Sequence, residues 1–290
     1  MLRLPNLASG ALRTATREAL AVTKSEQRQL AVLGSPIAHS KSPLIHRAAY
    51  ELLELPWDYG SAELTADGLE AFLKSCGAEW QGLSLTMPLK EEAHRLAVMR
   101  DPVAEQSGVV NTLLRLAGDA GWAGFNTDVP GLASAIDRAD LDVTHTIVLG
   151  SGATAVSAIL AVQHLGAERV QILARNTATA ADLAQRFNLE PGGNAAATLV
   201  ISTLPGPASD TVELPSELLQ IPLFDVAYDP WPSPLARRWE AAGGVSHSGL
   251  EMLVEQAIIQ IRIFRNGDPD TPLPSEDEVR AAMQRAVHSD

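Results

Sequence analysis

Short apolar runs alternate with amphipathic stretches along the first half of this chain. The runs have the length of buried strands, and the stretches between them place apolar residues at helical spacing. We expect strands at 30–33, 57–62 and 82–86 and helices at 42–53, 67–76 and 88–98. Strands that alternate with helices predict an α/β fold with a mostly parallel sheet.

The same alternation begins again near Asp142. We expect strands at 146–149, 169–173, 198–202 and 223–227 and helices at 154–165, 179–187 and 234–242. The last long amphipathic helix, 250–264, is more apolar than a solvent-facing end should be. It is therefore expected to pack back on the first unit, which makes two α/β domains the favoured organisation.

Composition excludes several classes of function. The 290 residues carry 22 Lys and Arg against 35 Asp and Glu, a formal net charge of −13. Nucleic-acid binding needs clustered basic residues, and membrane-surface binding needs a basic amphipathic face. Neither pattern is present, so we expect no nucleic acid or membrane partner. The single cysteine, Cys76, cannot form an intrachain disulfide and fits a reducing cytosol.

The chain shows no targeting signal that would change this picture. Its first thirty residues lack the continuous apolar core of a signal peptide, so 1–29 are expected to form an N-terminal tail of a cytoplasmic protein. The longest uncharged stretch, 144–167, is interrupted by Gly150, Gly152 and Gly166. A buried strand–turn–helix unit explains it better than a membrane span.

A glycine-rich turn lies inside that stretch. The segment from Gly150 to Ala155 reads G-x-G-x-x-A, directly after a predicted strand and at the start of a helix. Gly150 permits the tight turn, Gly152 lets the backbone approach a pyrophosphate, and the helix N-terminus supplies N–H donors. The pattern predicts a dinucleotide site. A purely structural turn is the alternative.

The end of the next strand indicates which dinucleotide is bound. An NAD site usually places a carboxylate there for the ribose 2′-hydroxyl. This chain has Ala174, Arg175 and Asn176 instead, and Arg175 suits a 2′-phosphate. The sequence therefore favours NADP, with Arg175 as a solvated surface cation as the alternative.

Polar clusters follow the first and third predicted strands. Ser40 and Ser42 place two hydroxyls at a predicted helix start, which suits a carboxylate, although Ser42 alone could be a plain cap. Alternation puts Ser84 and Thr86 on one strand face. Lys90 falls in the first turn of a helix, whose dipole disfavours a cation. A lysine so placed suits proton transfer, whereas most lysines are simply solvated.

A third cluster combines Asn111–Thr112 with Asn126–Asp128. Asp128 is a candidate partner for Lys90, and a turn or cap role is its alternative. All three clusters lie where predicted strands end, and ligands of open α/β sheets bind at such strand ends. Their coincidence indicates an active site.

These segments, in this order, resemble the shikimate dehydrogenase family. The resemblance spans roughly residues 30–265 and is carried by 32–43, 84–90, 109–112, 126–128, 150–155, 225–230 with 233–235, and 249–257. It implies two α/β domains around a cleft, an N-terminal substrate domain with a mostly parallel sheet and a Rossmann-type NADP domain. The implied boundaries are 30–128 with 249–290 for the substrate domain and 129–248 for the cofactor domain.

The resemblance also implies an activity and a set of site residues. The activity is NADP-dependent, reversible reduction of 3-dehydroshikimate to shikimate, a step toward chorismate and the aromatic amino acids. Lys90 and Asp128 would be the catalytic pair. The substrate would be bound by Ser40, Ser42, Ser84, Thr86, Asn111, Tyr228 and Gln256. The cofactor would contact Gly150, Ser151, Gly152, Ala153, Thr154, Ala174, Arg175, Asn176, Thr203, Val226, Gly249 and Met252. No metal is implied.

The chain departs from the usual family pattern in four places. Ser84 stands where Asn is commonest, and Gly152-Ala153 replaces a Gly-Gly pair. The usual Asn-Arg-Thr cofactor motif reads Ala174-Arg175-Asn176, and Thr179 replaces a second arginine. The smaller Ser84 leaves open a quinate/shikimate dehydrogenase that uses NAD. A non-catalytic NADP-binding sensor is the other alternative, although it would not need both Lys90 and Asp128. The chain is expected to act as a monomer or homodimer.

Overall fold

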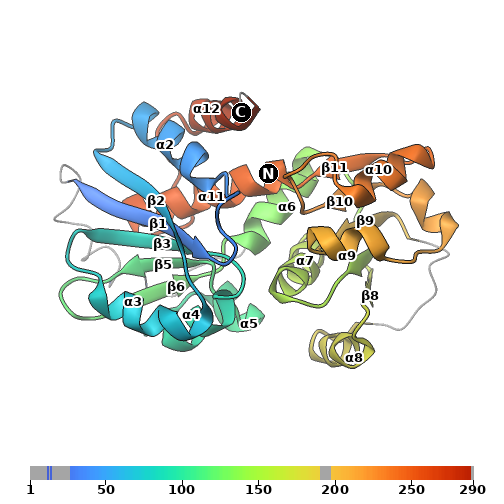
Figure 1. Cartoon of the computed structure of the whole chain (residues 1–290), viewed down its shortest axis with the longest axis horizontal. Helices are drawn as coiled ribbons and strands as arrows, with labels where there is room; N and C mark the ends of the chain where they lie inside the picture. Colours follow the sequence, from blue (N-terminus) through green and yellow to red (C-terminus); the bar gives the residue numbers. More distant parts are fainter. Residues whose placement is uncertain (1–11, 13, 15–26, 190–196, 289–290) are drawn as a thin grey trace. The chain divides into compact units, whose positions relative to one another are not determined.

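The computed structural model describes residues 12, 14, 27–189 and 197–288. The chain divides into two compact units (Figure 1). One comprises Met1–Thr127 and Val254–Asp290, and the other comprises Asp128–Leu253. Each unit has its own sheet, so the α/β fold with two sheets is confirmed.

The first unit is built on a six-stranded sheet with the order β2-β1-β3-β5-β6-β4. Its strands are β1 (Arg28–Gly34), β2 (Trp57–Glu63), β3 (Trp80–Leu85), β4 (Met99–Arg100), β5 (Thr112–Arg115) and β6 (Trp122–Phe125). β1 pairs in parallel with β2 and β3, whereas β5 runs antiparallel to both β3 and β6. The alternation pattern predicted β1, β2 and β3, and it missed β4, β5 and β6.

Helices cover both faces of this sheet. They are α2 (Ser42–Leu52), α3 (Leu69–Ser75), α4 (Lys90–Leu96), α5 (Pro102–Ser107), α11 (Leu250–Asn266) from Val254 onward, and α12 (Glu276–His288). The odd-numbered residues Leu33, Leu83 and Leu85 pack with Leu69 and Ala93 in one buried cluster. Side chains therefore alternate between the α3/α4 face and the opposite face, which α11 covers.

Gly82 explains how α11 comes so close to β3. A Cβ atom added to Gly82 would lie 2.3 Å from the Phe264 ring of α11. The preceding residue adds a polar link, because Gln81 Nε2 donates to the Phe264 carbonyl at 2.8 Å. Strand and helix are thus fixed in register, and α11 packs on the first unit as its apolar pattern predicts.

The second unit has a parallel five-stranded sheet with the order β11-β10-β9-β7-β8. Its strands are β7 (His145–Leu149), β8 (Arg169–Leu173), β9 (Leu199–Ser202), β10 (Leu223–Asp225) and β11 (Ser246–Ser248). Its helices are α6 (Asp128–Arg138), α7 (Ala153–His164), α8 (Thr177–Arg186), α9 (Gly206–Thr211), α10 (Pro234–Ala241) and the first residues of α11. A buried cluster that includes Ile147, Val200, Leu223 and Trp239 packs on this sheet.

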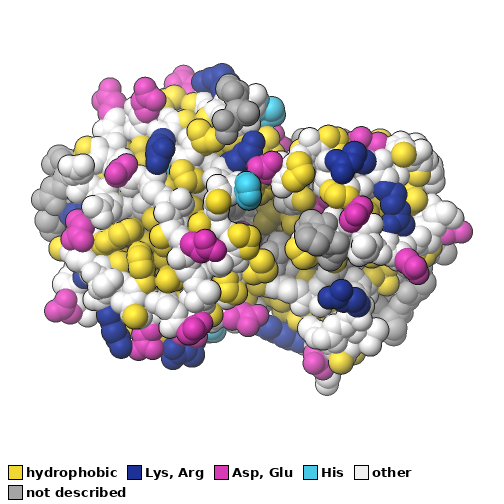
Figure 2. All heavy atoms as spheres, viewed as in Figure 1, with side chains coloured by type: hydrophobic (Ala, Val, Ile, Leu, Met, Phe, Trp, Pro, Cys, Tyr) yellow, Lys and Arg dark blue, Asp and Glu magenta, His cyan; other side chains and the backbone are white. Residues whose placement is uncertain are grey.

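The distribution of surface charge can be compared with the expectation that the protein binds neither nucleic acid nor a membrane. On the face seen in Figure 2, Lys and Arg side chains are interspersed with Asp and Glu and do not gather into one basic patch. Within the described part of the chain, none of the helices is long and apolar enough to span a membrane.

Candidate active site

The end of β1 lies directly against the segment that follows β3. The Thr86 amide donates to the Leu33 carbonyl at 2.9 Å, and the Ser35 amide donates to the Met87 carbonyl at 2.9 Å. A Cβ atom on Gly34 would lie 2.3 Å from Thr86 Cγ2. Glycine at this position therefore permits the first and second polar clusters to start from one point at the sheet edge.

The side chain of Ser40 contacts the backbone of Ser42. Ser42 is the first residue of α2, and its amide donates to Ser40 Oγ at 3.3 Å. The helix cap is Lys41, which makes no side-chain cap, so the alternative in which Ser42 is a plain helix cap is wrong. The reason is that the helix begins one residue earlier than a capping role for Ser42 requires. Its own hydroxyl is not used as the cap.

Ser84 lies deeper than its neighbour Thr86. The Ser84 side chain is buried, and its hydroxyl accepts from Tyr59 Oη at 2.6 Å and donates to Gln260 Oε1 at 2.8 Å. A serine hydroxyl has one hydrogen, so Ser84 has none left to donate to a ligand. Sequence reasoning missed Tyr59 and Gln260, which lie 25 and 176 residues away along the chain.

Asn111 and Gln256 come together around Thr127. Asn111 Nδ2 donates to Thr127 Oγ1 at 2.9 Å, and the Thr127 amide donates back to Asn111 Oδ1 at 2.8 Å. The Thr127 hydroxyl lies 3.4 Å from Gln256 Oε1. The first unit thus brings two of the predicted substrate-binding amides to one point, on the residue that precedes Asp128.

Lys90 and Asp128 each stand at the first position of a helix. Lys90 begins α4 in the first unit, and its carbonyl accepts from the Val110 amide at 2.9 Å. This contact ties the lysine to the segment that carries Asn111. Asp128 begins α6 in the second unit and follows Thr127 directly.

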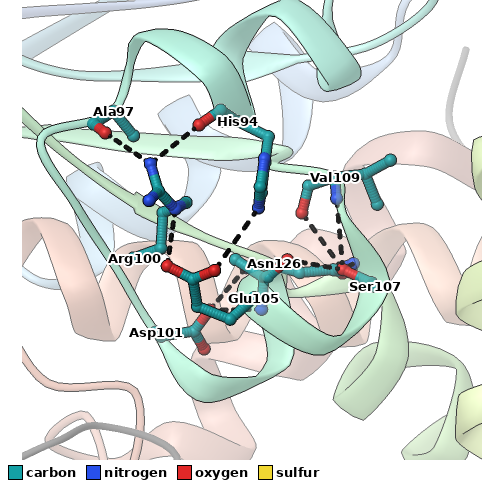
Figure 3. A network of polar contacts seen from close by, with 9 residues as sticks. His94, Ala97, Arg100, Asp101, Glu105, Ser107, Val109 and Asn126 are labelled. Atoms are coloured by element: carbon teal, nitrogen blue, oxygen red, sulfur yellow. Dashed lines mark hydrogen bonds and ion pairs between the residues drawn. The ribbon is translucent and has the colours of Figure 1, made fainter.

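A network of polar contacts, drawn in Figure 3, links α5 with Val109 in the segment before Asn111 and with Asn126. Asp101 caps α5 by accepting from the Ala104 amide at 2.8 Å, and it also accepts from the Asn126 amide at 3.3 Å. Asn126 Nδ2 donates to Ser107 Oγ at 2.9 Å. Burial raises the pKa of the Asp101 carboxyl to about 8, against the lowering effect of those amides. Sequence reasoning missed Asp101 and Ser107, although Asp101 followed by Pro102 is a typical helix start that could have indicated the cap.

In the second unit the glycine turn is tight at Gly150 and open at Gly152. Gly150 adopts a φ of +114°, and a Cβ there would lie 2.5 Å from Thr203 Oγ1. Gly152 precedes α7 with no side-chain cap, and a Cβ there would meet nothing within 4 Å. The first turn of α7, which includes Ala153 and Thr154, contains no acidic residue. An anion can therefore approach the free N–H groups beside Ser151.

The end of β8 carries no carboxylate. Arg175 is exposed, Ala174 is partly buried, and Asn176 caps α8 by accepting from the Thr179 amide at 3.1 Å. The capping contact uses the oxygen of the Asn176 amide and leaves its N–H donors. An exposed arginine beside an amide donor fits a phosphate on the adenosine ribose better than a free 2′-hydroxyl.

The remaining predicted residues of the second unit lie on the segments after β10 and β11. Gly249 packs on Val226 so closely that a Cβ would lie 2.1 Å from the Val226 carbonyl oxygen. Asp225 at the end of β10 accepts from Ser233 Oγ at 2.5 Å, which closes the loop that carries Tyr228. Met252 lies in the first turn of α11.

Comparisons with known protein families agree with this architecture. The family described as the shikimate dehydrogenase substrate binding domain matches residues 32–113. A curated protein of Hyphomonas neptunium, named shikimate dehydrogenase (NADP(+)), is 33% identical over 256 residues, which is 83% of this chain and 93% of that protein. One of the same name from Thermus thermophilus is 32% identical and covers 88% of this chain and 98% of its own.

Solved structures give the same result. The crystal structure of Mycobacterium tuberculosis shikimate dehydrogenase matches with a TM-score of 0.77 and 38% identity, over 91% of this chain and all of that chain. The Thermus thermophilus shikimate 5-dehydrogenase in complex with NADP(H) and shikimate matches with a TM-score of 0.78 and 30% identity. That match covers 89% of this chain and 99% of the other.

Proposed function

Because this chain belongs to the shikimate dehydrogenase family, we propose that it catalyses the NADP-dependent, reversible reduction of 3-dehydroshikimate to shikimate. This reaction is a step toward chorismate and the aromatic amino acids. The observation that carries the proposal is the first unit's set of side chains at one sheet edge, where Thr86, Asn111 and Lys90 follow β3 or precede β5.

NADP is the proposed cofactor, and the second unit is its proposed binding domain. Gly150, Ser151, Gly152, Ala153 and Thr154 would bind the pyrophosphate at the N-terminus of α7. Arg175 and Asn176, after Ala174, would bind the 2′-phosphate. Thr203, Val226, Gly249 and Met252 would surround the nicotinamide, which supplies the hydride when the cofactor is bound.

The substrate would be bound mainly by the first unit. The hydroxyls of Ser40 and Ser42 suit the carboxylate, and Tyr228 from the second unit would assist them. Thr86, Asn111 and Gln256 suit the ring hydroxyls, since each offers a donor or an acceptor near the same sheet edge. Ser84 would support these residues without donating to the substrate, because its only hydrogen is already donated to Gln260.

Lys90 and Asp128 would carry out the proton transfer. Negative charge develops on the ketone oxygen as the ring carbon is reduced, and the Lys90 ammonium donates a proton to that oxygen. In the reverse direction a neutral Lys90 accepts the hydroxyl proton, and Asp128 orients the lysine. General acid–base help of this kind is worth about 10²–10⁴-fold in rate.

Two further proposals concern selectivity and setting. Tyr59 Oη and Gln260 Oε1 stand within 2.8 Å of Ser84 Oγ, so protein atoms fill the space that the smaller residue leaves. This favours shikimate over quinate, whose extra hydroxyl would need that room.

The buried free thiol of Cys76 supports a cytoplasmic location, where we propose that the protein acts as a monomer or homodimer.

Steady-state kinetics would test the proposal. We expect kcat/KM to be highest for shikimate with NADP⁺ among the four pairings of shikimate or quinate with NADP⁺ or NAD⁺. Higher kcat/KM for quinate with NAD⁺ would favour the alternative enzyme, and no turnover in any pairing would favour a binding protein.

The role of Lys90 has its own test. Lys90→Ala removes the proton donor and acceptor but keeps the backbone contact with Val110, so kcat should fall by about 10²-fold or more. Shikimate affinity, measured by calorimetry, should change little. Turnover within twofold of the parent enzyme would exclude Lys90 from proton transfer.

A further inference from the structure

One buried carboxylate of the second unit has no part in the proposed chemistry. Asp225 is the last residue of β10, and its side chain is buried. It begins the 225–230 segment of the family resemblance, yet neither the hydride step nor the proton step involves it. Burial raises the pKa of the Asp225 carboxyl, against the lowering effect of the groups that donate to it. A buried carboxylate is costly unless it is hydrogen-bonded, so the donors around Asp225 indicate its role.

The two oxygens of Asp225 hold the two ends of one loop. The loop, residues 226–233, connects β10 to α10. At its start, Asp225 Oδ1 accepts from the Ala227 amide at 3.3 Å. At its end, Asp225 Oδ2 accepts from Ser233 Oγ at 2.5 Å. Ser233 Oγ also accepts from the Ala236 amide at 3.0 Å and so caps α10. One side chain therefore ties both ends of the loop to the end of β10.

Tyr228 is the residue of this loop that the closure would place. It follows Ala227 directly, so the bond to the Ala227 amide restricts the backbone that carries the tyrosine ring. A side chain that is already held in its bound position loses less conformational freedom when it binds a ligand. In the proposed function, the Tyr228 hydroxyl assists Ser40 and Ser42 at the substrate carboxylate. Closure of the loop would therefore favour substrate binding.

The residues proposed to lie near the nicotinamide are held by different contacts. The Val226 amide donates to the Ser202 carbonyl at 2.9 Å, and the Gly249 amide donates to the Ala227 carbonyl at 3.1 Å. Both are backbone hydrogen bonds, which a change in the Asp225 side chain leaves in place. Loss of the Asp225 contacts should therefore affect the substrate and spare the cofactor.

We propose that Asp225 is a positioning residue, which holds Tyr228 for the substrate carboxylate by closing the loop through Ala227 and Ser233. The inference rests on the proposed function, because Tyr228 assists binding only if the chain takes a carboxylate substrate such as shikimate. Asp225 itself is buried and touches neither substrate nor cofactor in this scheme. Its effect on substrate affinity therefore requires the Tyr228 hydroxyl.

The test is a double-mutant cycle. Asp225→Asn keeps the shape of the side chain but replaces one accepting oxygen by an N–H donor, so it cannot accept at both ends of the loop. It should raise the KM for shikimate about five- to tenfold, the effect of about one hydrogen bond, while kcat and the NADP⁺ KM stay within twofold. In a Tyr228→Phe background, Asp225→Asn should change the shikimate KM by less than twofold, because the hydroxyl through which it acts is absent.

Two further variants separate positioning from stability. Ser233→Ala removes the partner of Asp225 at the end of the loop and should raise the shikimate KM by a similar factor. Thr146→Val removes a buried hydroxyl that donates to the Val143 carbonyl at 2.9 Å. Thr146 lies near the start of β7, at the opposite edge of the same parallel sheet. Thr146→Val should lower the thermal stability and leave both KM values at those of the parent enzyme.

Three outcomes would overturn the inference. They are an unchanged shikimate KM in whichever of Asp225→Asn and Ser233→Ala folds, an equal rise in the NADP⁺ KM, and an Asp225→Asn effect on the shikimate KM that is as large with Phe at position 228 as with Tyr. Folding is checked by thermal unfolding of each variant. Failure of the parent enzyme to oxidise shikimate with NADP⁺ would instead refute the proposed function, so the two failures are distinguishable.

Discussion

Two glycines of the same turn allow the folding of the second unit to be tested separately from its proposed binding of NADP. Position 150 must lack a side chain for the unit to fold, because the φ of Gly150 is +114° and a Cβ would lie 2.5 Å from Thr203 Oγ1. That hydroxyl also donates to the Leu149 carbonyl at 2.8 Å. The backbone strain of Gly150→Ala alone costs about 1–3 kcal/mol. Displacing Thr203 adds a comparable overpacking cost of about 1–3 kcal/mol.

Gly152 should behave differently, although it lies only two residues away. Its φ is −89°, which any residue adopts, and a Cβ would meet no atom within 4 Å. The free energy of unfolding of Gly152→Ala should therefore fall by only about 1 kcal/mol or less, which is the difference between the two residues as helix caps. The added methyl would stand where the pyrophosphate approaches, so the NADP⁺ KM should rise about tenfold, equivalent to about 1.4 kcal/mol of binding.

The assay pairs urea unfolding without NADP⁺ with steady-state KM values for NADP⁺ and shikimate. We expect Gly150→Ala to be destabilised strongly. Gly152→Ala should be nearly as stable as the parent enzyme, with a shikimate KM close to the parent value. A Gly152→Ala variant whose NADP⁺ KM stays within twofold of the parent would refute the assignment of this turn to the pyrophosphate.

Three other predictions each concern one residue. Gly82→Ala should cost about 1–3 kcal/mol, because its Cβ would lie 2.3 Å from the Phe264 ring, and combining it with Phe264→Leu should cost less than the sum of the two. Burial lowers the pKa of His46 to about 3, so the unfolded chain takes up a proton below about pH 6.5 and the folded chain does not. Stability should therefore fall by up to about 1.4 kcal/mol per pH unit between pH 6.5 and 3, and urea unfolding of His46→Gln should lack this part of the slope. Arg175→Ala should raise the KM for NADP⁺ far more than that for NAD⁺; equal effects would remove Arg175 from 2′-phosphate recognition.

The local elements of both sheets were predictable from the sequence. Strands β1, β7 and β8 are short apolar runs that precede helix signals, and neighbouring residues alone decide such patterns. The glycine turn at Gly150 follows the same logic, since positive φ and a helix start are properties of consecutive residues. Strands β4, β5 and β6 were missed. β5 pairs with β3 across the intervening helices α4 and α5, and β6 pairs with β5 and β4, so these short strands depend on partners that no local pattern indicates.

The sequence by itself determined which groups this protein offers for chemistry: a glycine turn that suits a dinucleotide, an arginine without a nearby acid, and a lysine at a helix start. Tertiary structure alone decided how those groups are held. Ser84 looked like a ligand contact by strand alternation, yet its hydroxyl is taken up by Tyr59 and Gln260. Hydrogen-bond partners depend on distances between elements set by packing, such as the approach of Phe264 to Gly82, and no local pattern encodes them.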